Sequence, residues 1–125
     1  MTKIIIASDC GNSPKREFLK KLNIAFAKGD VAFLDACVTD SIRWEIIGDK
    51  TLEGKETFLK ELDTMKVSIA SELVLHKILT HGKEGAVNGT LKMHDGKKYA
   101  FSDFYEFSSG RDAKVKSIIS YVIKI

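Results

Sequence analysis

Hydrophobic residues recur at two different spacings along this chain. Over 14–28, 31–38 and 58–65 they return every three to four residues, which predicts three amphipathic helices. The segment 42–47 (IRWEII) and most of the second half are instead rich in β-branched and aromatic residues, which favours strands. The expected strands are 42–47, 72–81, 86–94, 98–107 and 115–125.

Capping residues fit the expected helices. Ser13 before Pro14 predicts a helix start, because the serine side chain can cap the helix while proline occupies the first turn, where its missing N–H is harmless. Gly29 suits the left-handed end of this helix, and Asp30 can cap the next one. A tight pair of helices is therefore expected.

Turn residues separate the expected strands. Asp95-Gly96 predicts a tight hairpin with both central residues at positive φ, and the glycines in 48–54 indicate further turns. Residues 1–12 are expected to be a flexible lead or a short edge strand. Helices early and strands late indicate an α+β class, in one domain over 1–125, with the helices covering one face of a curved sheet.

Composition narrows the classes of function. The 125 residues include 20 Lys and Arg and 17 Asp and Glu, and the lysines are scattered, so no nucleic-acid partner is expected. Cys10 and Cys37 lack metal-site spacing, and no histidine pair or phosphate-binding glycine motif occurs, so we expect no metal and no cofactor. No apolar run is long enough to span a membrane, and two free thiols favour the cytoplasm.

The segment 98–107 (KYAFSDFYEF) carries the main candidate for a site. Because side chains alternate along a strand, one face would hold Tyr99, Phe101, Asp103, Tyr105 and Phe107. A carboxylate among aromatic side chains is poorly solvated, so its pKa rises and it can become a neutral hydrogen-bond donor. The pattern therefore predicts a functional acid in an apolar pocket.

Three stretches carry a family resemblance from about residue 13 to the end of the chain: AKGD, IRWEIIGDKTLEGKETFLKEL and SDFYEF. With its order of elements, the chain resembles the nuclear transport factor 2-like superfamily, and within it the SnoaL-like and ketosteroid isomerase-like branches. The resemblance implies a cystatin-like cone, in which a strongly curved mixed or antiparallel sheet wraps around three helices. It also implies a pocket for an apolar or amphipathic small molecule and a homodimer through the sheet's outer face.

The resemblance also implies roles for single residues. Glu45, three residues before Gly48, stands where the isomerases have their general-base carboxylate, and Asp103 stands where they have a protonated oxyanion-hole acid. Leu22, on the first helix, stands where they have an oxyanion-hole tyrosine, and this position makes it a candidate for ligand contact. One such donor contributes several kcal/mol to catalysis, so the same steroid isomerisation is not implied.

Each candidate acid has a structural alternative. Asp103 could pair with a lysine of a neighbouring strand, such as Lys92 or Lys116, and Glu45 could be an exposed partner of Arg43. A general base must lie within hydrogen-bond reach of its substrate, so the position of each carboxylate relative to a cavity decides between these interpretations.

Four further residues are candidates for ligand contact. Trp44 shares a strand face with Ile42 and Ile46, opposite Arg43 and Glu45, and is either a pocket wall or part of the core. The aromatic face around Asp103 adds two ligand-contact candidates, and a lone histidine on an expected strand adds another, with a structural role as its alternative. These three are Phe101, Tyr105 and His76.

Two functions from different classes fit the sequence. The first is a SnoaL-like small-molecule-binding protein in which Glu45 and Asp103 perform acid/base chemistry without a cofactor, as an isomerase, cyclase or hydrolase. The second is a non-catalytic ligand-binding or dimerisation module. A protein-interaction scaffold that uses the outer sheet face is a third interpretation.

Overall fold

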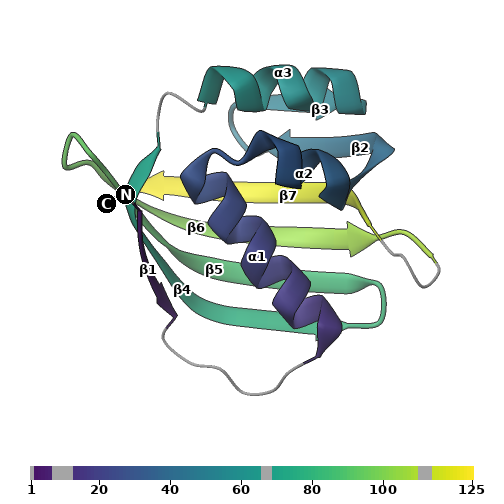
Figure 1. Cartoon of the computed structure of the whole chain (residues 1–125), viewed down its shortest axis with the longest axis horizontal. Coiled ribbons are helices and arrows are strands. Elements are labelled where there is room, and N and C mark those ends of the chain that lie inside the picture. The colour runs from purple at the N-terminus through teal and green to yellow at the C-terminus, as the bar shows by residue number, and fades with distance from the viewer. Residues whose placement is uncertain (1, 7–12, 66–68, 110–113) are drawn as a thin grey trace.

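The chain folds into a curved sheet with helices on one side. The computed structural model describes residues 2–6, 13–65, 69–109 and 114–125. Within these residues, three helices cover one face of a seven-stranded mixed sheet, and α1 crosses that face diagonally (Figure 1). The predicted α+β class with a curved mixed sheet is confirmed.

The strands follow the order β1-β4-β5-β6-β7-β2-β3 across the sheet. Four of them, β4 to β7, form the expected antiparallel meander, while β2 adds parallel to β7 and β1 adds parallel to β4. The strands are β1 (Lys3–Ile6), β2 (Val38–Ile46), β3 (Lys50–Glu53), β4 (Ala70–His81), β5 (Glu84–Met93), β6 (Lys98–Phe107) and β7 (Val115–Lys124).

The helices are α1 (Pro14–Lys28), α2 (Val31–Cys37) and α3 (Lys55–Met65). The Ser13 hydroxyl accepts the Arg16 N–H at 3.2 Å at the start of α1, as the sequence predicts. Gly29 ends α1 with φ 72°, and the Asp30 carboxylate caps α2 by accepting the Phe33 N–H at 3.1 Å. Consecutive caps turn the chain sharply, so α2 folds back beside α1.

Three local predictions are wrong. Residues 50–53, expected as part of a turn, form β3 and pair antiparallel with β2. Val38, expected at the end of the second helix, begins β2. Asp95 does not adopt positive φ; only Gly96 does (φ 87°), and its N–H donates to Met93 O at 3.0 Å. The longer loop thus needs one left-handed residue instead of two.

Of the two alternatives for residues 1–12, a flexible lead or a short edge strand, the described residues partly match the edge strand. Lys3–Ile6 form β1, a short strand at the edge of the sheet, and Thr2 is buried with its hydroxyl donating to Ala70 O at 2.7 Å. Residues 7–12, the rest of the expected lead, lie outside the described part of the chain.

A glycine and a bulge mark the bend of the sheet. The pairing of β4 with β5 shifts register between Leu75 and Lys77, opposite Gly89 of β5. A Cβ at Gly89 would lie 2.1 Å from Val74 O and 3.1 Å from Phe101 Cζ, so only glycine allows the strands to approach this closely. The bend makes the helix-covered face concave.

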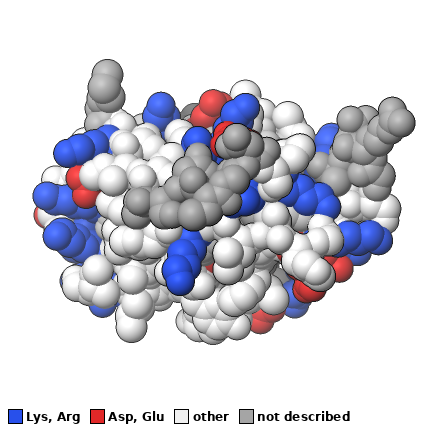
Figure 2. Space-filling model, turned by 90° about the horizontal axis from the view of Figure 1, so that it is seen from below, with Lys and Arg blue, Asp and Glu red and all other residues white. Residues whose placement is uncertain are grey.

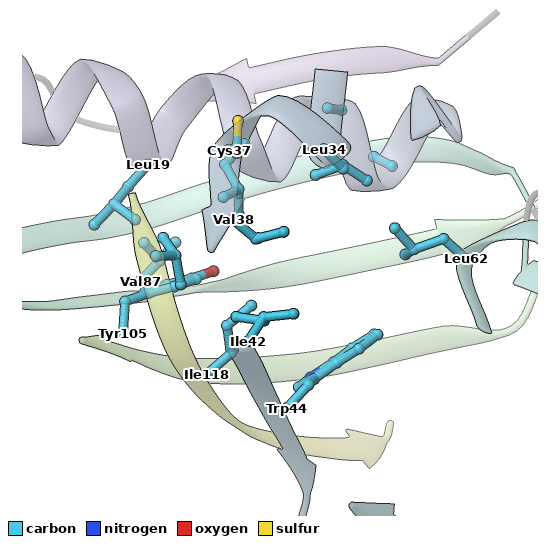
Figure 3. Packing of buried hydrophobic residues seen from close by; sticks show 14 of the residues in the cluster. Leu19, Leu34, Cys37, Val38, Ile42, Trp44, Leu62, Val87, Tyr105 and Ile118 are labelled. Carbon is cyan, nitrogen blue, oxygen red and sulfur yellow. The ribbon is translucent and has the colours of Figure 1, made fainter. Parts of the chain in front are cut away.

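The core lies between the helices and this concave face. Figure 3 shows Leu19 and Leu34 of the helices facing strand residues such as Val87 and Ile118. Cys37 belongs to this core, and burial raises the pKa of its thiol to about 11, as expected for a small buried hydrophobe. The largest fully buried side chains include Phe58, Phe107, Leu19, Leu22, Leu34, Ile42, Leu73, Leu75 and Ile118.

The charged surface has no single basic stripe on the face that Figure 2 shows. Lys and Arg side chains are spread across that face and are interspersed with Asp and Glu. Of the helices described, none combines the length and apolar character that crossing a membrane requires.

Candidate functional site

A cavity of about 430 Å³ opens between the concave face of the sheet and the helices. This volume lies within the range typical of small-molecule sites. The lining is mostly apolar and comes from all three helices and from β2, β4, β5, β6 and β7. Its aromatic members are Phe26, Trp44, Tyr99 and Phe101.

Strand alternation brings one acid into this cavity. Tyr99, Phe101 and Asp103 of β6 all line it, as the alternation over 98–107 predicts. Asp103 lies directly opposite Ser120 of β7, which also lines the cavity. Asp103 is only partly accessible, and its accessible surface faces the cavity.

Two chains of hydrogen bonds converge on the Asp103 carboxylate. From one side, Trp44 Nε1 donates to Ser120 Oγ at 2.9 Å. The Ser120 hydroxyl in turn donates its proton to the Asp103 carboxylate. From the other side, Asn23 Nδ2 donates to the Tyr105 hydroxyl at 3.1 Å, and this hydroxyl donates to Asp103 Oδ2 at 3.2 Å. The network fixes the carboxylate by contacts with α1, β2, β6 and β7.

Burial dominates the electrostatics of this acid. Loss of solvation raises the pKa of Asp103 from 3.8 to about 6, against the opposing effect of the Ser120 and Tyr105 hydrogen bonds. Burial, and then the Asp103 charge, raise the pKa of Tyr105 well above its usual value, so Tyr105 stays a protonated donor. Among the described residues, no cation forms an ion pair with Asp103, and Lys116 pairs with Glu106 at 3.5 Å.

The site therefore contains a carboxyl group that can exchange a proton near neutral pH. Because its two protein partners are both donors, the ionised form is the one the network holds in place. In the described ranges, no group of three His, Cys, Asp or Glu side chains comes together as potential metal ligands. The chemistry that the geometry itself offers is acid/base chemistry or hydrogen bonding to a ligand.

A model of the SnoaL-like domain matches residues 17–117 of the 125-residue chain. The chain belongs to the SnoaL-like family. Its membership confirms the resemblance to the nuclear transport factor 2-like superfamily that the sequence carries. No curated protein matches the sequence.

Solved structures share the fold of this SnoaL-like domain. A nuclear transport factor 2-like protein of unknown function from Cytophaga hutchinsonii is 22% identical, with a TM-score of 0.67 over 86% of this chain and 98% of that one. A similar protein of unknown function from Burkholderia xenovorans is 18% identical (TM-score 0.72, 86% and 80% covered). An uncharacterised Silicibacter pomeroyi protein with a cystatin-like fold is 17% identical (0.70, 86% and 74%). These likenesses support the fold and carry no activity.

The SnoaL-like domain does not bring its two candidate acids together. Glu45 lies on the face of β2 opposite Trp44 and does not line the cavity. Its carboxylate is about one-third exposed and accepts from Arg43 Nη1 at 3.3 Å, while Arg43 also pairs with Glu53 at 3.4 Å. Glu45 thus forms the ion pair with Arg43 that was the structural alternative to a catalytic role. The catalytic role of Glu45 stays an untested prediction.

The predicted ligand contacts of this domain divide into three groups. Trp44 and Phe101 line the cavity. Tyr105 is buried behind Asp103 and bonds to it. Leu22 is fully buried in the core and His76 is exposed at the bulge of β4, and neither lines the cavity.

Sequence reasoning missed two polar residues of the network, Asn23 and Ser120. Each is at most 5% exposed, so both stand out as buried polar groups. A signal was present for each: Asn23 interrupts the apolar stripe of α1, and Ser120 alternates with Ile118 and Val122 on β7. A polar residue inside an apolar pattern indicates a buried hydrogen bond.

Proposed function

We propose that this SnoaL-like domain binds an apolar or amphipathic small molecule in its cavity, with Asp103 as the polar group that contacts the ligand. The observation that carries the proposal is the single network-held carboxylate in a mostly apolar cavity of about 430 Å³. Apolar cavities with a few convergent polar groups are the usual form of small-molecule sites.

An acid/base reaction without a cofactor is the catalytic version of this proposal. With a pKa of about 6, Asp103 can accept or donate a proton near neutral pH, which suits an isomerase, a cyclase or a hydrolase. The alternative is a non-catalytic binding module in which the same carboxylate only orients the ligand. The position of Glu45 beside Arg43 favours chemistry that depends on Asp103 alone.

The fluorescence of a tryptophan in the cavity can be used to measure ligand binding. Trp44 is the only tryptophan and lines the cavity, so its fluorescence should change when a ligand enters. We expect at least one member of a panel of steroids, phenols and aliphatic alcohols to change the emission and to raise the melting temperature. A panel without any effect at millimolar concentration would refute the binding proposal.

Two variants of β6 show whether Asp103 is the contact. Asp103→Asn removes the carboxylate inside the cavity, and Glu106→Gln removes an exposed carboxylate on the opposite face of the same strand. We expect Asp103→Asn to change the affinity for the hit compound by about tenfold and Glu106→Gln to leave it unchanged. Equal affinities for both variants and the wild type would show that Asp103 touches no ligand.

We also propose a homodimer through the outer face of the sheet. Large apolar side chains are exposed there, and the rings of Phe104 and Tyr121 contact each other with centroids 6.1 Å apart. Sedimentation at micromolar concentration should show a dimer that Phe104→Glu converts to a monomer, whereas Lys60→Glu on α3 should have no effect. A monomeric wild type would contradict the proposal.

A further inference from the structure

The charges that line the cavity all have one sign. Its titratable lining residues are three carboxyl groups and one phenol, and no Lys, Arg or His is among the lining residues that the structure describes. The acids are Asp49, Glu61 and Asp103, and the phenol is Tyr99. Lys50 forms an ion pair with Glu61 at 3.1 Å, whereas the described partners of Asp103, Ser120 and Tyr105, are neutral.

This inventory disfavours an anionic ligand. A carboxylate or phosphate in the cavity would lie near Asp103, and the described lining residues include no cation that would balance either charge. Two like charges in a poorly solvated space repel strongly, and one of them must take up a proton. The cavity is therefore a poor site for fatty acids and other apolar anions.

The Asp103 carboxylate has acceptor capacity left for a ligand. An ionised carboxylate offers about four lone-pair positions, and among the residues that the structure describes only the Ser120 and Tyr105 hydroxyls donate to Asp103. Since Asp103 lines the cavity, the remaining positions are available to a donor that enters there. A charged donor would also offset the unfavourable burial of the carboxylate.

The aromatic walls suit the same kind of ligand. Phe26 and Trp44 are in contact, with ring centroids 5.5 Å apart, and both line the cavity together with Tyr99 and Phe101. The face of an aromatic ring attracts a cation, and Trp and Tyr do so better than Phe. The walls thus offer a favourable surface both to hydrocarbon groups and to the CH₂ groups next to an ammonium.

We propose that the ligand is an apolar amine, bound as its ammonium ion, with the N–H groups donating to the Asp103 carboxylate and the hydrocarbon part against the aromatic walls. The inference rests on the proposed binding function and adds the charge class of the ligand. The whole chain carries a net charge of +3, so the preference comes from the local lining and not from the overall charge.

Three matched series of compounds test the charge class. Each series has a phenyl, a naphthyl and a biphenyl body on a two-carbon chain, which ends in an amine, an alcohol or a carboxylate. Isothermal titration at pH 7.5 should show the amines binding about tenfold or more tightly than the alcohols, and the carboxylates binding most weakly.

The variants of β6 assign the preference to one residue. Asp103→Asn should lower the affinity for the amines at least about tenfold more than it lowers the affinity for the alcohols, while Glu106→Gln should change neither series. If Asp103→Asn does not fold, the order of the three series on the wild-type protein still decides.

The outcomes separate the inference from the proposed function. Alcohols or carboxylates that bind as tightly as the amines would overturn the charge class and leave small-molecule binding intact. An amine preference that survives Asp103→Asn would overturn the role of this carboxylate. If no member of any series binds, and the wider panel does not bind either, both the inference and the proposed function are refuted.

Discussion

The two faces of the sheet give a carboxylate different environments. On the concave face, Asp103 lies between aromatic side chains, is held by Ser120 and Tyr105, and has a pKa raised to about 6. On the outer face, Glu45 lies beside Arg43 and is about one-third exposed. Alternation along each strand places Asp103 of β6 on the cavity face of the sheet and Glu45 of β2 on the outer face.

The comparison shows that desolvation, more than residue type or family position, separates the two acids. The sequence resemblance gives both of them the positions of catalytic acids, yet of the two only Asp103 lines the cavity between the sheet and the helices. An exposed ion pair is worth little because water and salt screen it, whereas a buried carboxylate without a cation changes its proton affinity. The concave face is therefore where reactivity can arise.

The largest effect is expected from removing the bend that makes the faces differ. In Gly89→Ala, the new Cβ would lie 2.1 Å from the backbone oxygen of Val74, and the backbone cannot yield as a side chain can. We expect a loss of at least about 3 kcal/mol of unfolding free energy in urea denaturation.

Gly85→Ala is the matched control for the bend. Its Cβ would meet the end of the Leu19 side chain at 2.7 Å, which can move, so we expect a loss of only about 1 kcal/mol. If the two variants were equally stable, Gly89 would not be the residue that permits the bend.

The sequence predicts the strand that carries Asp103 well because its signal is local. Alternation over 98–107 gives the bounds of β6 and the face of Asp103, and alternation over 42–47 separates Trp44 from Glu45. The family resemblance, in contrast, paired Glu45 with Asp103, and the geometry does not bring them together.

The partners of Asp103 could not be predicted in the same way. The contact with Ser120 depends on the register between β6 and β7, and the contact of Asn23 with Tyr105 depends on how α1 is rotated above the sheet. Both are set by tertiary packing and not by a local pattern. The same holds for β3, whose four residues become a strand by pairing with β2.

A second prediction concerns the pH dependence of stability. Because the folded-state pKa of Asp103 is about 6 and its usual value is 3.8, the folded protein binds this proton more tightly than the unfolded chain. This tighter binding stabilises the folded state fully below about pH 4, and the stabilisation is lost as the pH rises to about 6. The resulting decrease in the free energy of unfolding is roughly 3 kcal/mol. Urea denaturation of the wild type should show this loss.

Two variants test the assignment of this pH dependence. Asp103→Asn cannot titrate, so its stability relative to the wild type should rise between pH 4 and pH 7. Ser71→Ala changes no titratable group, so it should give a profile parallel to that of the wild type. A parallel profile for Asp103→Asn would mean that this carboxyl group is solvated.

The two serines of β7 offer a smaller test of the same contrast. Ser120→Ala removes the acceptor of Trp44 Nε1 and a donor to Asp103, so we expect a loss of about 1–2 kcal/mol and a further rise in the pKa of Asp103. Ser117 bonds to Glu106 at 3.4 Å on the outer face, and Ser117→Ala should change stability by less than about 0.5 kcal/mol.

NMR of the carboxyl carbon chemical shift over a range of pH measures the pKa of Asp103 in Ser120→Ala, and urea denaturation measures the loss of stability in both serine variants. An unchanged pKa of Asp103 in Ser120→Ala would show that the serine hydroxyl does not donate to the carboxylate. Equal losses of stability in both serine variants would remove the contrast between the faces.

The smallest effect is expected on the outer face, where Arg43 lies 3.3 Å from Glu45 and 3.4 Å from Glu53. Since Arg43 is about half exposed, with 47% of its side chain accessible, water and ions screen both pairs. A double-mutant cycle of Arg43→Ala and Glu45→Gln should give a coupling of about 0.5 kcal/mol or less that disappears in 1 M salt. The proposed dimer contact involves Phe104 of β6 and Tyr121 of β7, and we expect Arg43 and Glu45 of β2 to lie outside it. A coupling above about 2 kcal/mol that persists in salt would contradict this and would place β2 inside the dimer contact.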